Sequence, residues 1–362
     1  MRRQKSILDI KMNVFKNRVG LVIWILAALV CVSGPVFSEK ISTRVIVNGT
    51  PWLDTQGNEI WCNGGQTLQK GDTWYWVGYD TGPGREWSIK LYSSKNLVDW
   101  KFLRILLAKG PGVPEFKWAG RPGLLYNRKT RRYIILFESE TGQWFRHKVG
   151  YASCDRIDGD YKYEHSEFPE PDRSTGDQSI YQEGDDAYLL TVLDSPGLKD
   201  PINKDLAIYQ LSPDFLHVEK KLFEGFDRFE PGARGNEATH IVKVGGIYYW
   251  FMSGLNSWNS TETQYSTARR LKGPWSPLKV LATEPLSGNS FNSQHDFIIT
   301  VKGKDKTSYI YAGDRYSQWT MSGTGRNIFL PLEFEKGVPK ITWHDAWTID
   351  MRTGRYSEIR KP

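Results

Sequence analysis

The sequence repeats itself with a period of 55 to 61 residues, and this regularity restricts the choice of fold. A short aromatic segment typical of a β-strand recurs along the chain, centred on Trp74, Tyr133, Tyr188, Tyr248 and Tyr309. A second such segment follows the first four at its own steady interval, around Tyr92, Tyr151, Tyr209 and Tyr265. Two registers with one period indicate repeated structural units.

Each unit is predicted to be a meander of about four short antiparallel strands. Five such units favour an all-β radial array, a five-bladed β-propeller of four-stranded antiparallel blades. The period exceeds the ~40–45 residues of WD40 units and the ~50 of kelch units. No long helical periodicity follows Lys40, which argues against a TIM barrel and leaves a β-sandwich as the alternative fold.

Residues 1–38 are predicted to be a secretory signal peptide, which leaves residues 39–362 as a single propeller domain. They combine a basic start, an apolar run over residues 19–32 and small residues before Glu39. The alternative is an uncleaved membrane anchor, since the apolar run almost spans a thinned bilayer. We therefore expect a secreted or periplasmic protein that is attached to a membrane only if this segment stays uncleaved.

The charge and the cysteines exclude several classes of function. The net charge of +7 comes mainly from residues 1–38, and the remainder carries +2, which gives no reason to expect a nucleic-acid partner. Beyond the signal only Cys62 and Cys154 remain, without a CxxC or HExxH motif. We expect neither zinc nor redox chemistry, and we expect a monomer.

A shorter strand precedes each aromatic segment, and in a propeller it would lie innermost. The leading residues of these strands are 56 to 60 positions apart, and they are Asn63, Arg121, Asp177, Glu237 and Gln294. Because equivalent positions of a closed ring converge, these polar side chains are predicted to meet at one end of the axis. Carboxylates, a guanidinium and amides in a concave mouth suit general acid catalysis on a neutral polar substrate. Glu237, crowded by Asp177, is the candidate acid, and we expect a raised pKa for it.

Each residue also has a structural interpretation. Asp177 can cap a turn, Asn63 can be a turn residue before Gly64-Gly65, Arg121 can form a structural ion pair, and Gln294 can satisfy backbone groups. The shared register favours the functional interpretation for Asp177 and Glu237.

The stretch from Trp52 to Ile349 resembles glycoside hydrolase family 43, and within it the branch related to exo-β-1,3-galactanases. Short motifs in a specific order carry the resemblance. They include Tyr92-Ser93-Ser94-Lys95-Asn96-Leu97, Arg121-Pro122, Asn236-Glu237-Ala238, Ser253-Gly254-Leu255, Gly273-Pro274-Trp275, Ser293-Gln294 and Gly313-Asp314-Arg315.

The resemblance implies a five-bladed propeller that hydrolyses glycans with inversion of configuration. By position, Glu237 matches the general acid of the family, and Asp177 matches the carboxylate that orients this acid and tunes its pKa. Gln294 matches a glutamine that takes the water-side role in the galactanase branch. Two positions depart from the family: Asn63 stands at or near the usual Asp base, as in that branch, and Gly120 stands where the branch usually has Glu.

Several further side chains are candidates for substrate contact. Trp258 and Trp319 are predicted to stack on sugar rings, and Arg315 is predicted to hold a hydroxyl-rich ring or to pair with Asp314. Asn63 and Arg121 complete the predicted substrate-binding set. Many of the tryptophans have the alternative role of packing the blades together.

The predicted function is an exported, inverting glycoside hydrolase that acts from the ends of galactose- or arabinose-containing polysaccharide. The alternatives are a non-catalytic glycan-binding propeller, and an arabinofuranosidase or xylosidase of the same family. A protein-binding scaffold is a weaker hypothesis, because buried unpaired carboxylates are costly. We expect no cofactor; by analogy with the family a structural calcium ion is an alternative, although no liganding loop is evident in the sequence.

Overall fold

The computed structural model describes residues 44–84, 88–108, 119–140, 147–171, 173–194, 204–226, 235–256, 258–316 and 325–359. Every element assigned within these ranges is a β-strand, which confirms the predicted all-β class. The predicted signal segment, residues 1–38, lies outside the described residues. Nowhere in the described ranges is there a helix with the length and apolar character needed to cross a membrane.

Most strands belong to groups of four that are consecutive in the sequence. The first group is β2 (Asn63–Lys70), β3 (Thr73–Tyr79), β4 (Ile89–Ser94) and β5 (Lys101–Leu107). The second is β6 (Ala119–Asn127), β7 (Arg132–Glu140), β8 (His147–Cys154) and β9 (Lys162–Glu167). The third is β10 (Thr175–Glu183), β11 (Asp186–Asp194), β12 (Lys204–Leu211) and β13 (Val218–Gly225).

The remaining strands form two more groups and a small sheet. The fourth group is β14 (Asn236–Val244), β15 (Ile247–Gly254), β16 (Thr263–Ala268) and β17 (Lys279–Val280). The fifth is β19 (Gln294–Lys302), β20 (Thr307–Asp314), β21 (Asn327–Glu335) and β22 (Val338–Thr342), preceded by the short β18 (Ala282–Glu284). A separate sheet contains β1 (Ile46–Val47), β23 (Ala346–Ile349) and β24 (Tyr356–Glu358).

Tight turns before the aromatic strands explain the repeated pattern. Two residues join Lys70 to Thr73, Glu183 to Asp186 and Val244 to Ile247, which are paired across their hairpins. The turns contain Gly71, Gly184 and the pair Gly245-Gly246, all with positive φ. Two-residue hairpins of this kind need positive φ, which glycine adopts without steric cost. The glycine-rich turns therefore fix where three of the five aromatic strands start.

The sheets differ in detail from five equal sheets of four strands. A single residue pair, Thr175 with His147, joins β10 to β8, so that the second and third groups form one eight-stranded sheet. The fifth group gains β18, which pairs in parallel with β22. The other strand pairs are antiparallel, as predicted.

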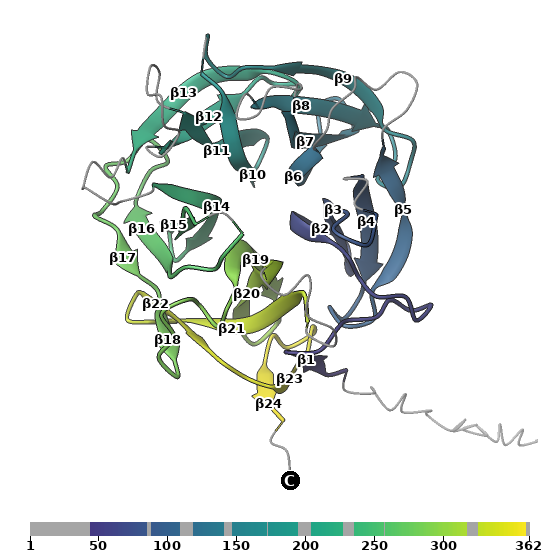
Figure 1. Ribbon diagram of the computed structural model, residues 1–362, viewed down its shortest axis with the longest axis vertical. Coiled ribbons are helices and arrows are strands. Elements are labelled where there is room, and N and C mark those ends of the chain that lie inside the picture. Colours follow the sequence, from purple (N-terminus) through teal and green to yellow (C-terminus); the bar gives the residue numbers. More distant parts are fainter. Residues whose placement is uncertain are drawn as a thin grey trace, which may run out of the picture. The chain divides into compact units, whose positions relative to one another are not determined.

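The first strands of the groups lie side by side in a closed circuit. Residues of β2 contact β6, which contacts β10, and the series continues through β14 and β19 back to β2. Figure 1 shows these first strands nearest the centre, with the later strands of each group farther out. Apolar clusters lie between consecutive groups, and the cluster of Trp76, Phe297 and Phe329 joins the fifth group to the first. The core is thus divided among the interfaces between neighbouring groups of strands.

Each of these first strands contains a β-bulge near its beginning. The register shifts between Asn63 and Gln66, Gly120 and Gly123, Thr175 and Gln178, Glu237 and His240, and His295 and Phe297. A bulge inserts an extra residue, bends the strand and redirects side chains. The bulges explain why the strand beginnings, where the candidate residues lie, can aim polar groups at one another.

Gly65, within the bulge of β2, provides a test of this local geometry. A Cβ atom at Gly65 would lie 1.7 Å from the carbonyl oxygen of Val77, so the backbone would have to move. Replacement of Gly65 by alanine is expected to lower the free energy of unfolding by about 1–3 kcal/mol, measured by urea denaturation. Gly288 is the control, because its Cβ would meet nothing within 4 Å, and Gly288→Ala should change stability little. Equal stability of both variants would contradict the described bulge.

Candidate active site

Arg121 is the centre of the polar cluster at the beginnings of the first strands. Its side chain is 5% exposed, and its φ of 41° lies in the left-handed region that non-glycine residues seldom adopt. Nε lies 2.9 Å from Oδ2 of Asp177, and Nη1 lies 3.2 Å from Oδ1 of Asp296. Nη2 donates a hydrogen bond of 2.6 Å to Oε1 of Gln294. The guanidinium therefore binds side chains from both β10 and β19, and the strained backbone at the bulge allows it to do so.

Gln294 connects Arg121 to Glu237. Its Oε1 accepts from Arg121, and its Nε2 donates a hydrogen bond of 2.8 Å to Oε1 of Glu237. Because a guanidinium can only donate, the bond to Arg121 fixes which end of the Gln294 amide is the oxygen. The NH2 group must then face the Glu237 carboxyl.

Asp177 lies beside the backbone of Glu237. Its Oδ2 accepts a hydrogen bond of 3.0 Å from the backbone N of Ala238, as well as contacting Arg121. Ala238 has a φ of 52°, so the chain after Glu237 also adopts the left-handed conformation. Asp177 is one-fifth exposed and Glu237 is only partly buried, whereas Gln294 is buried. The two carboxylates are thus the members of the cluster that solvent reaches.

Two buried carboxyl groups, Asp296 and Asp314, form a second layer behind Arg121. Asp314 accepts hydrogen bonds from the backbone N of Gly64 and from the side chains of Asn63, Tyr316 and Asn327. Burial and the neighbouring Asp314 raise the pKa of Asp296, although Arg121 opposes this rise. Burial also raises the pKa of Asp314, while Arg121 and its donors lower it. The pair therefore retains a proton more readily than two separate carboxylates would.

Asn63 belongs to this second layer. It is fully buried, its Nδ2 donates 2.7 Å to Asp314 Oδ1, and its Oδ1 accepts 2.5 Å from the hydroxyl of Thr81. Both ends of the amide are therefore engaged by protein groups. Within the described residues, Asn63 directs these bonds to β20 and to the residues after β3, and it makes no hydrogen bond to Arg121 or Gln294.

The predicted substrate-contact residues fall in different places. Trp258 is 41% exposed and packs edge-on against Tyr316, with ring centroids 5.2 Å apart. Tyr316 in turn bonds Asp314, which places Trp258 next to the buried network. Arg315 turns away, because it donates to the backbone oxygens of Phe291 and Asn292, and burial lowers its pKa. The predicted Asp314–Arg315 pair is not among the described contacts, and Trp319 lies outside the described residues.

Gly120, the second departure from the family, lies opposite Glu138 in the pairing of β6 with β7. Glu138 is 3% exposed and contacts Nδ1 of His147. Directly paired residues in antiparallel strands project from the same face. A buried carboxyl group thus occupies the neighbouring strand beside the position where the branch usually has Glu.

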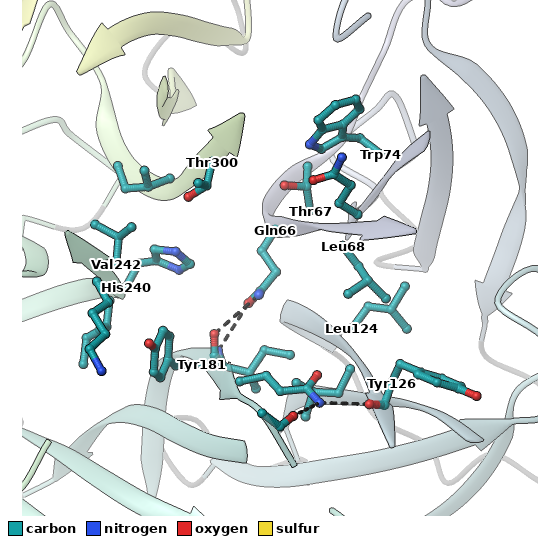
Figure 2. Close-up of a pocket in the computed structure, with 18 of the residues that line it drawn as sticks. Gln66, Thr67, Leu68, Trp74, Leu124, Tyr126, Tyr181, His240, Val242 and Thr300 are labelled. Carbon is teal, nitrogen blue, oxygen red and sulfur yellow. Dashed lines mark hydrogen bonds between the residues drawn. The ribbon is translucent and has the colours of Figure 1, made fainter. Parts of the chain in front are cut away.

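A cavity of about 700 Å³ lies along the later halves of the first strands, away from Arg121 and Glu237. Figure 2 shows Gln66, Tyr181, His240 and Thr300 around it. The Gln66 side chain there exchanges hydrogen bonds of 3.3 and 3.4 Å with the backbone of Ile180. Burial lowers the pKa of His240 to about 3, so its imidazole is neutral. No residue of the Arg121 cluster lines this cavity.

Sequence reasoning thus found four residues that the structure brings together, namely Arg121, Asp177, Glu237 and Gln294. The sequence also offered Asp296, two positions after Gln294, as an alternative group to hold the attacking water, and Asp314 as a partner of Arg315, but it did not identify Tyr316 or Thr81. A carboxyl group beside an open surface, bonded to an amide that a buried cation positions, can act as a proton donor. Cys62 and Cys154 are free and buried.

Comparison with known proteins also indicates chemistry that depends on a proton donor of this kind. The sequence model of Glycosyl hydrolases family 43 matches residues 65–339. An exo-β-1,3-galactanase from Clostridium thermocellum shares 28% identity, with a TM-score of 0.76, over 87% of this chain and 68% of that one. One from Phanerochaete chrysosporium, in complex with β-1,3-galactotriose, shares 29% identity, with a TM-score of 0.75, over 87% and 71%. No curated protein gives a significant match.

Proposed function

This chain belongs to glycosyl hydrolases family 43 and is a glycoside hydrolase, and we propose that it removes galactose units from the ends of β-1,3-linked galactan. The observation that carries the proposal is the chain of contacts from Arg121 through Gln294 to Glu237. The exo-β-1,3-galactanases among the similar structures support the choice of linkage.

Glu237 is assigned the role of general acid in this proposal. A carboxylic acid at the partly open face would give its proton to the glycosidic oxygen as the bond to galactose breaks. Asp177 holds the backbone beside Glu237 through the bond from the Ala238 amide. Asp177 therefore positions the acid.

Gln294 is assigned to the attacking water. An amide oxygen has two lone pairs, and Arg121 uses one of those on Oε1. In this proposal the bound sugar separates Gln294 from Glu237, and the second lone pair then accepts a hydrogen from the attacking water on the face opposite the leaving group, as inversion requires. An amide is a weak base, so the reaction relies on acid catalysis and on the positioning of the water.

We also propose that the five groups of strands are the blades of a five-bladed propeller. The closed circuit of contacts among β2, β6, β10, β14 and β19 supports this assignment. The apolar clusters between consecutive groups support it as well, since propeller blades pack face to face. In that arrangement the beginnings of the first strands surround one mouth of the axis.

For the sugar itself, we propose stacking on Trp258, whose exposed ring adjoins Tyr316. Arg121 would act on the substrate through Gln294 and Asp177, because its guanidinium is buried. Substrate contact by Asn63, Arg315 and Trp319 stays a prediction. Export through cleavage after residue 38, with an uncleaved anchor as the alternative, also stays a prediction. The same holds for action as a monomer without a cofactor.

A non-catalytic glycan-binding protein is the second candidate function. Two observations favour it: the amide of Asn63 stands at or near the usual position of the base, and Gly120 lacks the usual carboxylate. A binding protein of this kind would hold β-1,3-galactan without releasing galactose.

Proton NMR during hydrolysis of β-1,3-galactotriose tests the function and the mechanism together. We expect galactose to appear first as the α-anomer, because inversion converts a β-linkage into an α-product. A first product in the β-form would contradict the inverting mechanism. Binding without any release of galactose over long incubation would support the second candidate. Cleavage of aryl arabinofuranosides or xylosides in preference to galactan would reassign the substrate.

A further inference from the structure

Two histidines and a glutamate converge on the outer strands, outside the candidate active site. His165 and Glu167 lie on β9, and His217 lies in the turn between β12 and β13. Oε2 of Glu167 is 4.0 Å from Nε2 of His165 and 3.4 Å from Nδ1 of His217. One ligand atom from each residue lies within 4.8 Å of the others. The cluster therefore joins the second group of strands to the third.

The spacing and the types of atom fit a tetrahedral transition-metal ion. With metal–ligand bonds of about 2.0–2.1 Å, the ligand atoms of a tetrahedral zinc site lie about 3.3 Å apart. The distances of 3.4 and 4.0 Å approach this value without movement of the backbone. Two imidazoles and one carboxylate are a zinc donor set, whereas calcium and magnesium prefer oxygen ligands alone.

Neighbouring groups hold the three ligands in place. Oε1 of Glu167 accepts 2.9 Å from the hydroxyl of Tyr151 and 2.7 Å from the backbone N of Val218, which leaves Oε2 to face the imidazoles. The ring of His165 lies between Tyr151, at 4.8 Å, and His217, at 4.6 Å with an interplanar angle of 27°, so one imidazole must rotate before both nitrogen lone pairs can point at one ion. Bonds of this kind to a ligating carboxylate fix its orientation and strengthen metal binding.

The turn that carries His217 is also ordered by its own hydrogen bonds. The backbone N of Ser212 donates to the oxygen of His217, and the Ser212 hydroxyl accepts from the N of His217. Asn127, from the second group, donates 2.9 Å to the oxygen of Pro213. The position of His217 relative to β9 is therefore set before any ion binds.

His165 provides an independent reason to expect a ligand. Its Nε2 atom is buried and finds no hydrogen-bond partner within the described part of the chain. A buried polar atom without a partner is costly and needs an explanation.

We propose that His165, Glu167 and His217 bind one Zn²⁺ ion, which clamps β9 to the turn between β12 and β13. The ion is structural and has no part in the proposed hydrolysis. It coordinates the Nε2 atom of His165, which otherwise has no partner, and it links the outer strands of two neighbouring groups. No local sequence motif marks the site, since 52 positions separate His165 from His217.

Isothermal titration of the metal-free full chain with ZnCl2 tests the proposal. We expect one ion per chain, and we expect His165→Gln and His217→Gln each to weaken binding at least about 100-fold, since a ligand is lost. Zinc should also raise the thermal midpoint of the wild type and leave that of His217→Gln unchanged. His217 is 57% exposed, so its replacement leaves the core intact.

His344→Gln is the matched control. His344 also contacts a single glutamate, Glu358 at 3.6 Å, but it is not part of the three-residue cluster. This variant should bind zinc as the wild type does. Absence of zinc binding by the wild type, or equal binding by His165→Gln, would overturn the proposal. Near-UV circular dichroism of each variant shows that the fold is retained.

Discussion

Glu237→Gln is expected to lower the rate of galactan hydrolysis by a factor of about 10²–10⁴, which is the usual contribution of a general acid. A glutamine side chain cannot give a proton to the leaving oxygen. It keeps the shape of glutamate, and its oxygen can still accept the hydrogen bond that Gln294 Nε2 now makes to Glu237. The loss should therefore appear in kcat for β-1,3-galactotriose, with little change in the free energy of unfolding.

Glu262→Gln is the control for this substitution. Glu262 is an exposed residue just before β16, and the same chemical change there should leave both rate and stability as in the wild type. If Glu237→Gln retained full activity, Glu237 would not be the acid. If it instead lost stability, its role would be structural.

Arg121→Ala is expected to have the largest effect on stability, a loss of about 3–5 kcal/mol in the free energy of unfolding. Removal of the guanidinium leaves Asp177, Asp296 and Gln294 without their shared donor. Burial alone would lower the pKa of Arg121, but the charges of Asp177 and Asp296 raise it, so the group stays charged and pairs with both. Urea denaturation with tryptophan fluorescence measures the loss.

Two further variants distinguish the interpretations of Arg121. Arg156→Ala removes an exposed arginine that contacts Asp158 at 3.1 Å, and such surface pairs contribute at most about 1 kcal/mol. Arg121→Lys keeps the charge but cannot reproduce three directed contacts, so we expect an intermediate stability and low activity. An Arg121→Ala protein as stable as the wild type would show that the cluster does not support the fold.

The strands were predictable because their signals are local. The aromatic residues Trp74, Tyr133, Tyr188, Tyr248 and Tyr309 all lie in the second strand of a group, and the glycine turns before three of them fix the hairpins. Pairings between distant segments leave no such signal. The bridge between β10 and β8, the parallel pair of β18 with β22 and the sheet of β1 with β23 therefore appear only in the structure.

Only part of the candidate site was predictable from the sequence. The residues that were misplaced depend on the direction in which each side chain points. Side chains alternate across a strand, so the inward position of Asp314 at the end of β20 turns Arg315 the other way. The bulge in β2 directs Asn63 to Asp314 rather than to Arg121. A repeat period predicts the spacing of equivalent positions, but it does not predict the direction in which the side chains of Arg315 and Asn63 point.

The short sheet of β1, β23 and β24 has a consequence for the synthesis of the chain. Among the described strands, β1 at Ile46–Val47 pairs with β23 alone, and Asn48 donates to the oxygen of Phe329, 281 residues later in the sequence. During translation the early segment lacks its partner until β23 has been synthesised. The sheet of β1, β23 and β24 can therefore form only after nearly 300 further residues have followed β1.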